Sequence, residues 1–153
     1  MKISVAAEPF ESADGRRLVA ALDADLATRY SPDQMYGMNL KPEQLAPGLG
    51  TFVIARVGGQ AAGCGALRML DDSTAELKRM YVEPKLRGHG IAKAILSSLE
   101  AAAKELGATR LVLETGIHQA EAIGLYRGVG FRAIDCFGVY AGSSSSLCFE
   151  KPI

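Results

Sequence analysis

The spacing of apolar residues predicts three consecutive strands in the middle of the chain. Short segments rich in apolar residues run over 51–57, 60–69 and 74–82. They are separated by Gly58-Gly59, which is typical of a two-residue hairpin turn, and by the polar turn 71–73. The central third of the chain is therefore expected to form an antiparallel meander.

Helical spacing predicts a helix on either side of this meander. The first helix is expected to be capped by Ser12 or Asp14 and to end near Arg29 or Tyr30, and its apolar face consists of Leu18, Val19, Leu22 and Leu26. The second is expected to end at a cap on Gly107, and its apolar face consists of Ile91, Ile95, Leu99, Ala102 and Leu106.

The remaining segments complete a single mixed α/β domain over residues 1–153. A weak alternation predicts a first strand over 2–7, and 33–46 are expected to hold a short helix and a loop. Residues 111–115 follow the second helix, so this strand should lie parallel to 74–82 through a right-handed crossover. A third helix is predicted from Gln119 to Arg127, and closing strands are predicted at 131–139 and 146–151.

Composition and charge restrict the partners of the protein. The chain has 153 residues, of which 48% are hydrophobic, and its 17 basic and 17 acidic residues cancel. This balance argues against nucleic-acid and membrane binding, and the N-terminus does not resemble a signal peptide, so a cytoplasmic protein is expected. Cys64, Cys136 and Cys148 are widely spaced and form no metal motif with the two histidines. They are expected to be buried free thiols, and no metal is expected.

A glycine-rich junction runs from Glu76 to Ala92, with the sequence E-L-K-R-M-Y-V-E-P-K-L-R-G-H-G-I-A. It is expected to be a strand, a loop and the first turn of a helix, where free backbone N–H groups and the helix dipole favour a phosphate. Arg87 adds a permanent charge, and Gly88 and Gly90 allow a ligand to approach the backbone. The segment therefore predicts a site for a phosphorylated cofactor.

Three phosphate-binding designs can be compared with this loop. A nucleotide P-loop is excluded because Ile91-Ala92 follow the second glycine instead of Lys-Ser/Thr. A Rossmann dinucleotide site is opposed by the bulky Lys93, by the polar residues of the preceding strand and by the short chain that follows Glu114. That interpretation is kept as a minor alternative.

The third design is a resemblance to a known family. The segment R-G-H-G-I-A, after a strand that ends Met80-Tyr81-Val82, resembles the coenzyme A pyrophosphate loop of the GNAT superfamily of N-acetyltransferases. Downstream, Q-A-E-A-I-G-L-Y-R-G-V-G-F resembles the second signature of the superfamily. The resemblance covers about residues 51–150, and it departs from the pattern at Gln119, where many members carry Asn.

The resemblance implies a fold and a cosubstrate. The expected fold is a mostly antiparallel sheet with a splayed pair of parallel strands and helices on both faces. Acetyl-CoA is expected to lie in the gap between these strands. The residues implied in its binding are Met80, Tyr81, Val82, Arg87, Gly88, His89, Gly90, Ile91, Ala92 and Gln119.

The resemblance also implies the proton carriers of a direct acetyl transfer. Tyr126 occupies the position of the acid that protonates the departing thiolate, and Glu76 the position of the base that deprotonates the amine. Counting in steps of two along the strand places Glu76 on the same face as Met80. Glu114 is the competing carboxylate or a substrate-positioning residue, and Tyr36 is a candidate for the acceptor side.

The expected function is acetyl transfer from acetyl-CoA to a primary amine of a small molecule or an amino-acid-like acceptor, through a tetrahedral intermediate. The family resemblance also implies a homodimer. A non-catalytic acyl-CoA sensor is the alternative from another class, since a sensor would keep the loop and lack working proton carriers.

Overall fold

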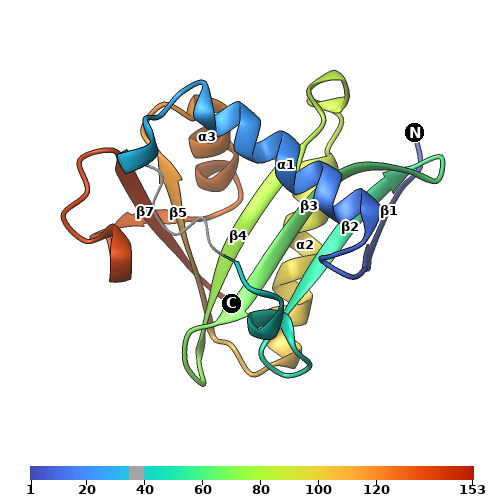
Figure 1. Ribbon diagram of the computed structural model, residues 1–153. Coiled ribbons are helices and arrows are strands. Elements are labelled where there is room, and N and C mark those ends of the chain that lie inside the picture. The colour runs from blue at the N-terminus through green and yellow to red at the C-terminus, as the bar shows by residue number, and fades with distance from the viewer. Residues whose placement is uncertain (35–39) are drawn as a thin grey trace.

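The protein folds around one seven-stranded sheet with the strand order β1-β2-β3-β4-β5-β7-β6 (Figure 1). The computed structural model describes residues 1–34 and 40–153. The strands are β1 (Ile3–Ala7), β2 (Gly50–Val57), β3 (Gln60–Met69), β4 (Thr74–Val82), β5 (Arg110–Gly116), β6 (Arg132–Ile134) and β7 (Ser146–Pro152). The helices are α1 (Ala13–Ala27), α2 (Ile91–Glu105) and α3 (Ala120–Gly128), with short 3-10 turns at Pro32–Gln34, Pro42–Leu45, Pro84–Leu86 and Gly138–Tyr140.

β2, β3 and β4 form the predicted antiparallel meander, and β1 adds an antiparallel strand at the edge beside β2. The turn between β2 and β3 has positive φ angles of 58° at Gly58 and 83° at Gly59, which a two-residue hairpin of this type requires. The polar turn before β4 is held by Asp71, whose carboxylate accepts hydrogen bonds from the backbone N–H groups of Ser73 and Thr74. The meander thus ends in the strand that precedes the glycine-rich loop.

The sheet contains a single parallel pair among its described strands, and that pair opens along its length. β4 and β5 pair only from Thr74 with Arg110 to Leu77 with Leu113. Beyond Leu113, β5 continues its pairing with β7 on its other side as far as Gly116. The two parallel strands therefore diverge, as the family resemblance implies, and α2 makes the crossover between them.

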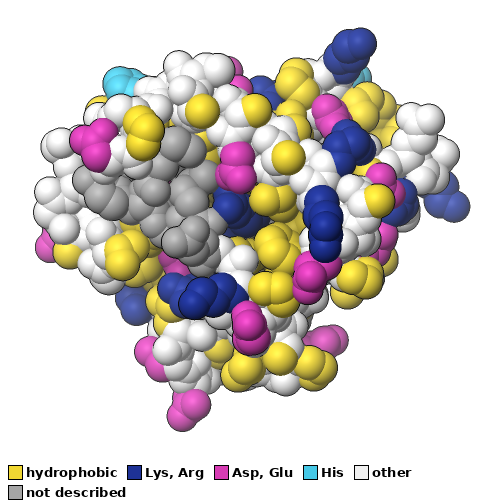
Figure 2. Space-filling view, viewed as in Figure 1, with side chains coloured by type: hydrophobic (Ala, Val, Ile, Leu, Met, Phe, Trp, Pro, Cys, Tyr) yellow, Lys and Arg dark blue, Asp and Glu magenta, His cyan; other side chains and the backbone are white. Residues whose placement is uncertain are grey.

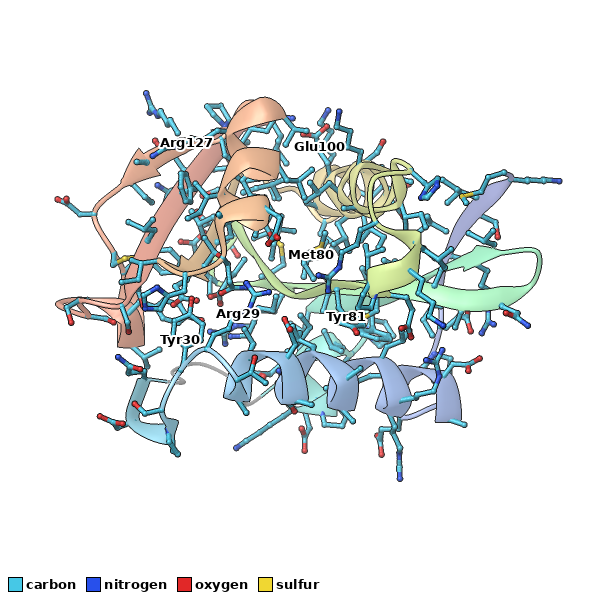
Figure 3. The ribbon with its side chains drawn as sticks, turned by 90° about the horizontal axis from the view of Figure 1, so that it is seen from above. Arg29, Tyr30, Met80, Tyr81, Glu100 and Arg127 are labelled. Carbon is cyan, nitrogen blue, oxygen red and sulfur yellow. A yellow bond between two sulfur atoms is a disulfide. The ribbon has the colours of Figure 1, made fainter. Side chains whose placement is uncertain are left out.

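Helices cover both faces of the sheet. Figure 3 shows α1 on one side and α2 and α3 on the other. Leu18, Leu22 and Leu26 of α1 are buried against one face, and Ile95 and Leu99 of α2 are fully buried against the opposite face. Ser12 caps α1 by accepting a 3.0 Å hydrogen bond from the backbone N–H of Gly15.

Several predicted boundaries differ from those observed. α1 ends at Ala27 rather than near Tyr30, because Thr28 turns back to cap the last carbonyls. The closing strand expected over 131–139 comprises only Arg132–Ile134. The chain then leaves the sheet and forms the Gly138–Tyr140 turn, which buries Tyr140. The middle of the segment 33–46 lies outside the described residues, with 3-10 turns on either side.

The prediction of three free thiols is wrong for two of the cysteines. Cys136 and Cys148 form a disulfide with a Cα–Cα distance of 5.1 Å, while Cys64 is a buried free thiol. Sequence spacing gave no indication of this pair, because β7 folds back beside β6 and places Ile134 opposite Cys148. The bridge closes the loop that carries Tyr140.

Charged groups of both signs are mixed on the surface. Figure 2 shows basic and acidic side chains interspersed on the face that carries α1, with no large area of one sign among the residues it describes. Within the ranges 1–34 and 40–153, no helix has the length and apolar character needed to cross a bilayer.

Candidate active site

A cleft of about 540 Å³ runs from the glycine-rich loop to the opening between β4 and β5. One wall is the end of β4 and the start of α2, and the other is α3, with α1 contributing from the far face. Its lining residues include Leu22, Arg29, Met80, Tyr81, Val82, Arg87, Gly88, Gly90, Ile91, Ala92, Lys93, Gln119, Leu125 and Tyr126. Nearly all the residues predicted to bind the cosubstrate therefore line one cleft, and His89 lies in the same loop.

The glycine-rich loop presents backbone to this cleft. Gly88 and Gly90 have φ angles of 82° and 85°, a conformation that side-chain-bearing residues rarely adopt. Gly90 is the N-cap residue of α2, so the first N–H groups of that helix have no partner within the helix. A Cβ on either glycine would meet no atom within 4 Å, so the space above the loop is open to a ligand.

Arg87 is held in place by neighbours at the end of β4. Its Nε donates a 2.9 Å hydrogen bond to the carbonyl oxygen of Val82, and its guanidinium lies 5.7 Å from the ring centre of Tyr81. The ring nitrogen Nδ1 of His89 lies 3.1 Å from the carbonyl oxygen of Leu86, on the exposed side of the loop. These contacts hold the side chains of Arg87 and His89 against the backbone and the Tyr81 ring at the end of β4 and in the loop.

A bulge in β4 separates the two faces of the strand. Lys78 pairs with Ala66 and Tyr81 with Cys64, so two residues of β4 lie opposite Gly65 alone. Arg79, inside this bulge, has a positive φ of 58°. The extra residue shifts the alternation of side chains by one position.

The bulge corrects the predicted placement of Glu76 on the same face as Met80. Met80 packs against the α2 side of the sheet, where its sulfur would lie 2.7 Å from a Cβ at Gly65. Figure 3 shows Met80 and Tyr81 on opposite sides of the sheet. Glu76 points to the α1 side, toward Arg68 and Tyr140. Counting side chains in steps of two gives the wrong face here, because it assumes a strand without a bulge.

A smaller cavity of about 90 Å³ occupies the opening between β4 and β5, and we call it the slot. It is lined by Leu22, Leu26, Leu77, Lys78, Arg79, Met80, Glu114, Thr115, Gln119, Tyr126 and Tyr140. Leu22, Met80, Gln119 and Tyr126 line the slot and the larger cleft alike. The two cavities therefore adjoin at Tyr126.

Tyr126 is buried at this junction, with 6% of its surface exposed. Its ring packs edge-on against Phe131 at 5.7 Å. Burial raises the pKa of its phenol above the ordinary value, and the nearby charge of Glu114 raises it further. None of the described residues makes a hydrogen bond to the Tyr126 hydroxyl. The side chain is thus a neutral phenol that lines both cavities.

Glu114 lies on the far wall of the slot, at the end of β5. One of its carboxylate oxygens accepts a 2.6 Å hydrogen bond from the Ser146 hydroxyl on β7. Burial raises the pKa of the Glu114 carboxyl, an effect that the Ser146 bond and the charge of Lys78 partly offset. A carboxyl with a raised pKa and a buried phenol therefore line the same cavity, an arrangement typical of sites that transfer protons.

Glu76 lies in the closed part of the β4–β5 pair. Its surface is 1% exposed. It forms a 2.9 Å ion pair with Arg68 and accepts a 3.1 Å hydrogen bond from the Tyr140 hydroxyl. Lys78 lies 3.9 Å from its second oxygen. Glu76 belongs to the lining of neither cavity, so the structure does not bring it together with Tyr126.

The start of α3 is tied to the end of α1 by Tyr30. The Tyr30 hydroxyl accepts a hydrogen bond from the His118 backbone N–H at 3.1 Å and donates one to Gln119 Oε1 at 3.4 Å. Gln119 Oε1 also accepts from the Gly116 backbone N–H at 2.9 Å. A Cβ at Gly116 would overlap the Tyr30 ring. The position that departs from the family pattern, Gln119, therefore holds the turn between β5 and α3.

Sequence reasoning missed other groups in the slot. Lys78, Arg79, Thr115 and Tyr140 were not predicted as site residues, and Tyr140 reaches the slot only through the turn that follows β6. The Thr115 hydroxyl is buried without a hydrogen-bond partner among the described residues. Strand period does identify Lys78 as sharing a face with Glu76, but no local signal placed Tyr140 opposite both. The candidate Tyr36 lies outside the described residues.

The described residues contain no cluster of three His, Cys, Asp or Glu side chains arranged to hold a metal ion.

Comparisons with known proteins agree with this architecture. The model of the acetyltransferase (GNAT) family matches residues 17–131. The chain is 36% identical over 138 residues to an IAA acetyltransferase of Azospirillum brasilense, covering 90% of this chain and 89% of that protein. It is 31% identical over 144 residues to the Bacillus subtilis N-acetyltransferase YsnE, covering 91% and 94% of the two chains.

Solved structures show the same fold. A Klebsiella pneumoniae protein assigned as an acyl-CoA N-acyltransferase superposes with a TM-score of 0.84 at 32% identity, covering 98% of this chain and 97% of that one. The PaiA N-acetyltransferase of Thermoplasma acidophilum, solved in complex with coenzyme A, has a TM-score of 0.74 at 21% identity over the full length of both chains. The mostly antiparallel sheet excludes the Rossmann alternative. The chain is an acetyltransferase enzyme that belongs to the GNAT family.

Proposed function

We propose that this enzyme transfers the acetyl group of acetyl-CoA directly to a primary amine of a small molecule. One observation carries the proposal: Tyr126 lines both the cleft that begins at the glycine-rich loop and the slot that contains Glu114. A donor in the cleft and an acceptor in the slot would therefore meet at a phenol.

The cleft suits the pyrophosphate and the arm of acetyl-CoA. The left-handed glycines and the first turn of α2 offer backbone N–H groups to a pyrophosphate, and Arg87 and Lys93 add positive charge. The apolar wall formed by Met80, Leu125 and the end of β4 suits the less polar arm. The Thermoplasma protein with the same fold was solved with coenzyme A, which supports this assignment.

We assign the base to Glu114 rather than to Glu76. Glu114 faces the slot, and its raised pKa matches the task of accepting a proton from an ammonium group. Glu76 is committed to Arg68 and Tyr140 in the closed part of the sheet. We therefore move the predicted role of base from Glu76 to the competing carboxylate, Glu114. Glu76 accepts the hydrogen bond from Tyr140, which lines the slot.

We assign the acid to Tyr126. The amine nitrogen forms a bond to the thioester carbon as Glu114 takes up its proton. When the carbon–sulfur bond breaks, the Tyr126 hydroxyl gives a proton to the departing thiolate. Because the pKa of Tyr126 is raised, its phenol stays protonated until this step. The phenolate then recovers its proton from solvent.

Turnover of acetyl-CoA against a panel of primary amines tests the proposal, with coenzyme A binding measured separately by calorimetry. We expect both binding and acetylation of at least one amine. Binding without transfer to any amine would favour the acyl-CoA sensor.

Substitution of the loop tests the cofactor site. Gly90→Val places a β-branched residue at φ 85°, where it is strained, and should weaken coenzyme A binding about tenfold or more. Gly48→Val is the matched control, because Gly48 has φ 86° in a turn outside the cleft. It should lose stability and keep its affinity for coenzyme A. Equal affinities in the two variants would contradict the assignment of the loop.

A further inference from the structure

One buried hydroxyl of the slot is left without a partner by the part of the chain that the structure describes. The hydroxyl oxygen of Thr115 is buried, and none of the described residues forms a hydrogen bond with it. The residue as a whole is 4% exposed, and it lines the slot between β4 and β5. A buried hydroxyl without a partner destabilises a fold, so its presence in a cavity points to a ligand that pairs with it.

Thr115 and Glu114 reach the slot from opposite faces of the sheet. β5 pairs with β7 in an unbroken register from Arg110 to Gly116, so its side chains alternate without a bulge. Thr115 therefore shares a face with Leu113, which packs in the core on the α2 side, and Glu114 lies on the other face. Both line the slot because β4 has separated from β5 at this level. A ligand at the level of the sheet would thus lie between a hydroxyl and a carboxylate.

Most other polar side chains of the slot have no oxygen to offer a ligand. Lys78 and Arg79 carry only hydrogen-bond donors. The amide oxygen of Gln119 already accepts two hydrogen bonds, which is the number of its lone pairs. The Tyr140 hydroxyl already accepts one hydrogen bond and donates one.

The attacking amine needs two acceptors. A neutral primary amine turns its lone pair toward the thioester carbon and keeps two N–H groups, which become more acidic as the new bond forms. Glu114 takes one of these protons, and the Tyr126 hydroxyl serves the departing sulfur as a donor. The hydroxyl of Thr115 has two lone pairs and is the remaining acceptor for the second N–H among the described side chains of the slot.

We propose that Thr115 determines specificity by accepting a hydrogen bond from the second N–H of the acceptor amine. This inference rests on the proposed acetyl transfer and adds a residue to its acceptor site. One proton of the amine passes to Glu114, and the other stays on nitrogen in the amide product. A secondary amine has a single N–H, which Glu114 takes, so the Thr115 hydroxyl would remain buried and unpaired. The site therefore favours primary over secondary amines.

Pairs of amines test this preference. Each primary amine that the enzyme acetylates is compared with its own N-methyl derivative, by kcat/KM at one pH. We expect the native enzyme to prefer the primary amine by about 100-fold, of which part reflects the bulk of the methyl group.

Thr115→Val isolates the contribution of the hydroxyl, because valine keeps the shape of the side chain. It should lower kcat/KM about tenfold for the primary amines and less than about twofold for the N-methyl derivatives. The ratio between the two substrates should therefore fall by most of a factor of ten. The bulk and basicity of each substrate are the same for both enzymes, so they do not contribute to this change. Thr115→Ser keeps a hydroxyl and should restore most of the native ratio.

Thermal unfolding gives a second measurement that does not depend on turnover. Thr115→Val removes a hydroxyl that the fold leaves unpaired, so its melting temperature should equal or exceed that of the native protein. Thr74→Val is the matched control, because Thr74 is 5% exposed on β4 and lines neither the slot nor the cleft. The Thr74 side chain forms a hydrogen bond with the Asp71 carboxylate. This control should lose stability and keep the native ratio.

The outcomes separate this inference from the proposed function. An equal fall in kcat/KM for both kinds of amine would place the Thr115 hydroxyl on the thioester oxygen and overturn its assignment to the nitrogen. An unchanged ratio would also overturn it, and a lower melting temperature of the same variant would then show that the hydroxyl serves the fold. Both results leave acetyl transfer intact. Binding of coenzyme A without transfer to any amine would overturn the proposed function, and this inference with it.

Discussion

The pair of parallel strands β4 and β5 has a closed part and an open part, and the two contain similar groups in different states. In the closed part, Glu76 is enclosed by Arg68, Tyr140 and Lys78. In the open part, Glu114 faces a cavity and has one side-chain hydrogen bond, from Ser146. This contrast is the basis for the proposal that Glu76 serves the fold and that Glu114 takes part in the chemistry.

This difference follows from where backbone pairing stops. As far as Leu77 and Leu113, the backbones of the two strands pair with each other and their side chains pack together. One residue later, the strands part around the slot, and Lys78 and Glu114 line it. Substitutions in the open part should therefore lower kcat and leave stability nearly unchanged. Substitutions in the closed part should lower the free energy of unfolding and leave kcat nearly unchanged.

The largest effect is expected at Tyr126 in the open part. Tyr126→Phe keeps the packing against Phe131 and removes only the proton donor. We expect kcat to fall about 10³-fold with nearly unchanged stability and coenzyme A affinity. The loss should be smaller for acetyl donors with more acidic thiols, because their thiolates leave without a proton. A variant that is destabilised and fully active would make Tyr126 a core residue.

Glu114→Gln should lower kcat by about 10²-fold. In the native enzyme the rate should rise with pH as Glu114 loses its proton, and this limb should disappear from the pH profile of the variant. A carboxyl whose pKa is raised in the folded state is destabilising above that pKa, since the unfolded chain releases its proton more readily. Unfolding by denaturant at neutral pH should thus show equal or higher stability for the variant. An unchanged pH profile would return the base to Glu76 or to water.

Glu76→Gln should show the reverse. Loss of the charge leaves Arg68 without its carboxylate in a half-buried position, and we expect the free energy of unfolding to fall by about 1–3 kcal/mol. Chemical denaturation measures this loss, and kcat should change less than tenfold. A 100-fold fall in kcat with full stability would show that the closed part also performs catalysis.

The smallest effect is expected from Ser146→Ala. The Ser146 hydroxyl lowers the pKa of Glu114, so its removal should raise that pKa and move the rising limb of the pH profile to higher pH. The plateau at high pH should remain close to that of the native enzyme. A lower plateau without a shifted limb would mean that Ser146 positions the carboxylate rather than tuning it.

The sequence predicted the elements well because their signals are local. The hairpin at Gly58-Gly59, the cap at Ser12 and the glycine-rich loop each depend on neighbouring residues, and all three lie where they were expected. The parallel position of β5 followed from chain order alone. The family resemblance then supplied the split in the sheet.

The parts that escaped prediction depend on distant contacts. The Cys136–Cys148 disulfide and the burial of Tyr140 require β7 to return beside β6. The tie between Tyr30 and Gln119 joins residues that lie 89 positions apart. The prediction that Glu76 and Met80 share a face was wrong for a local reason. One extra residue in the bulge places every later side chain of β4 on the face opposite to the one that counting in steps of two predicts.

The bulge at Arg79 shifts the alternation of side chains along β4 by one residue. Before it, the residues toward α1 have even numbers, as with Glu76 and Lys78, and after it they have odd numbers, as with Tyr81. One strand can therefore supply walls to two adjoining cavities, with Lys78 before the bulge lining the slot and Tyr81 after it lining the larger cleft. Deletion of a single residue at this point would exchange the two faces of β4 after the bulge, so that Met80 would face α1 and Tyr81 would face α2. The number of residues in β4 therefore decides which side chains each face of the strand presents to the cavities.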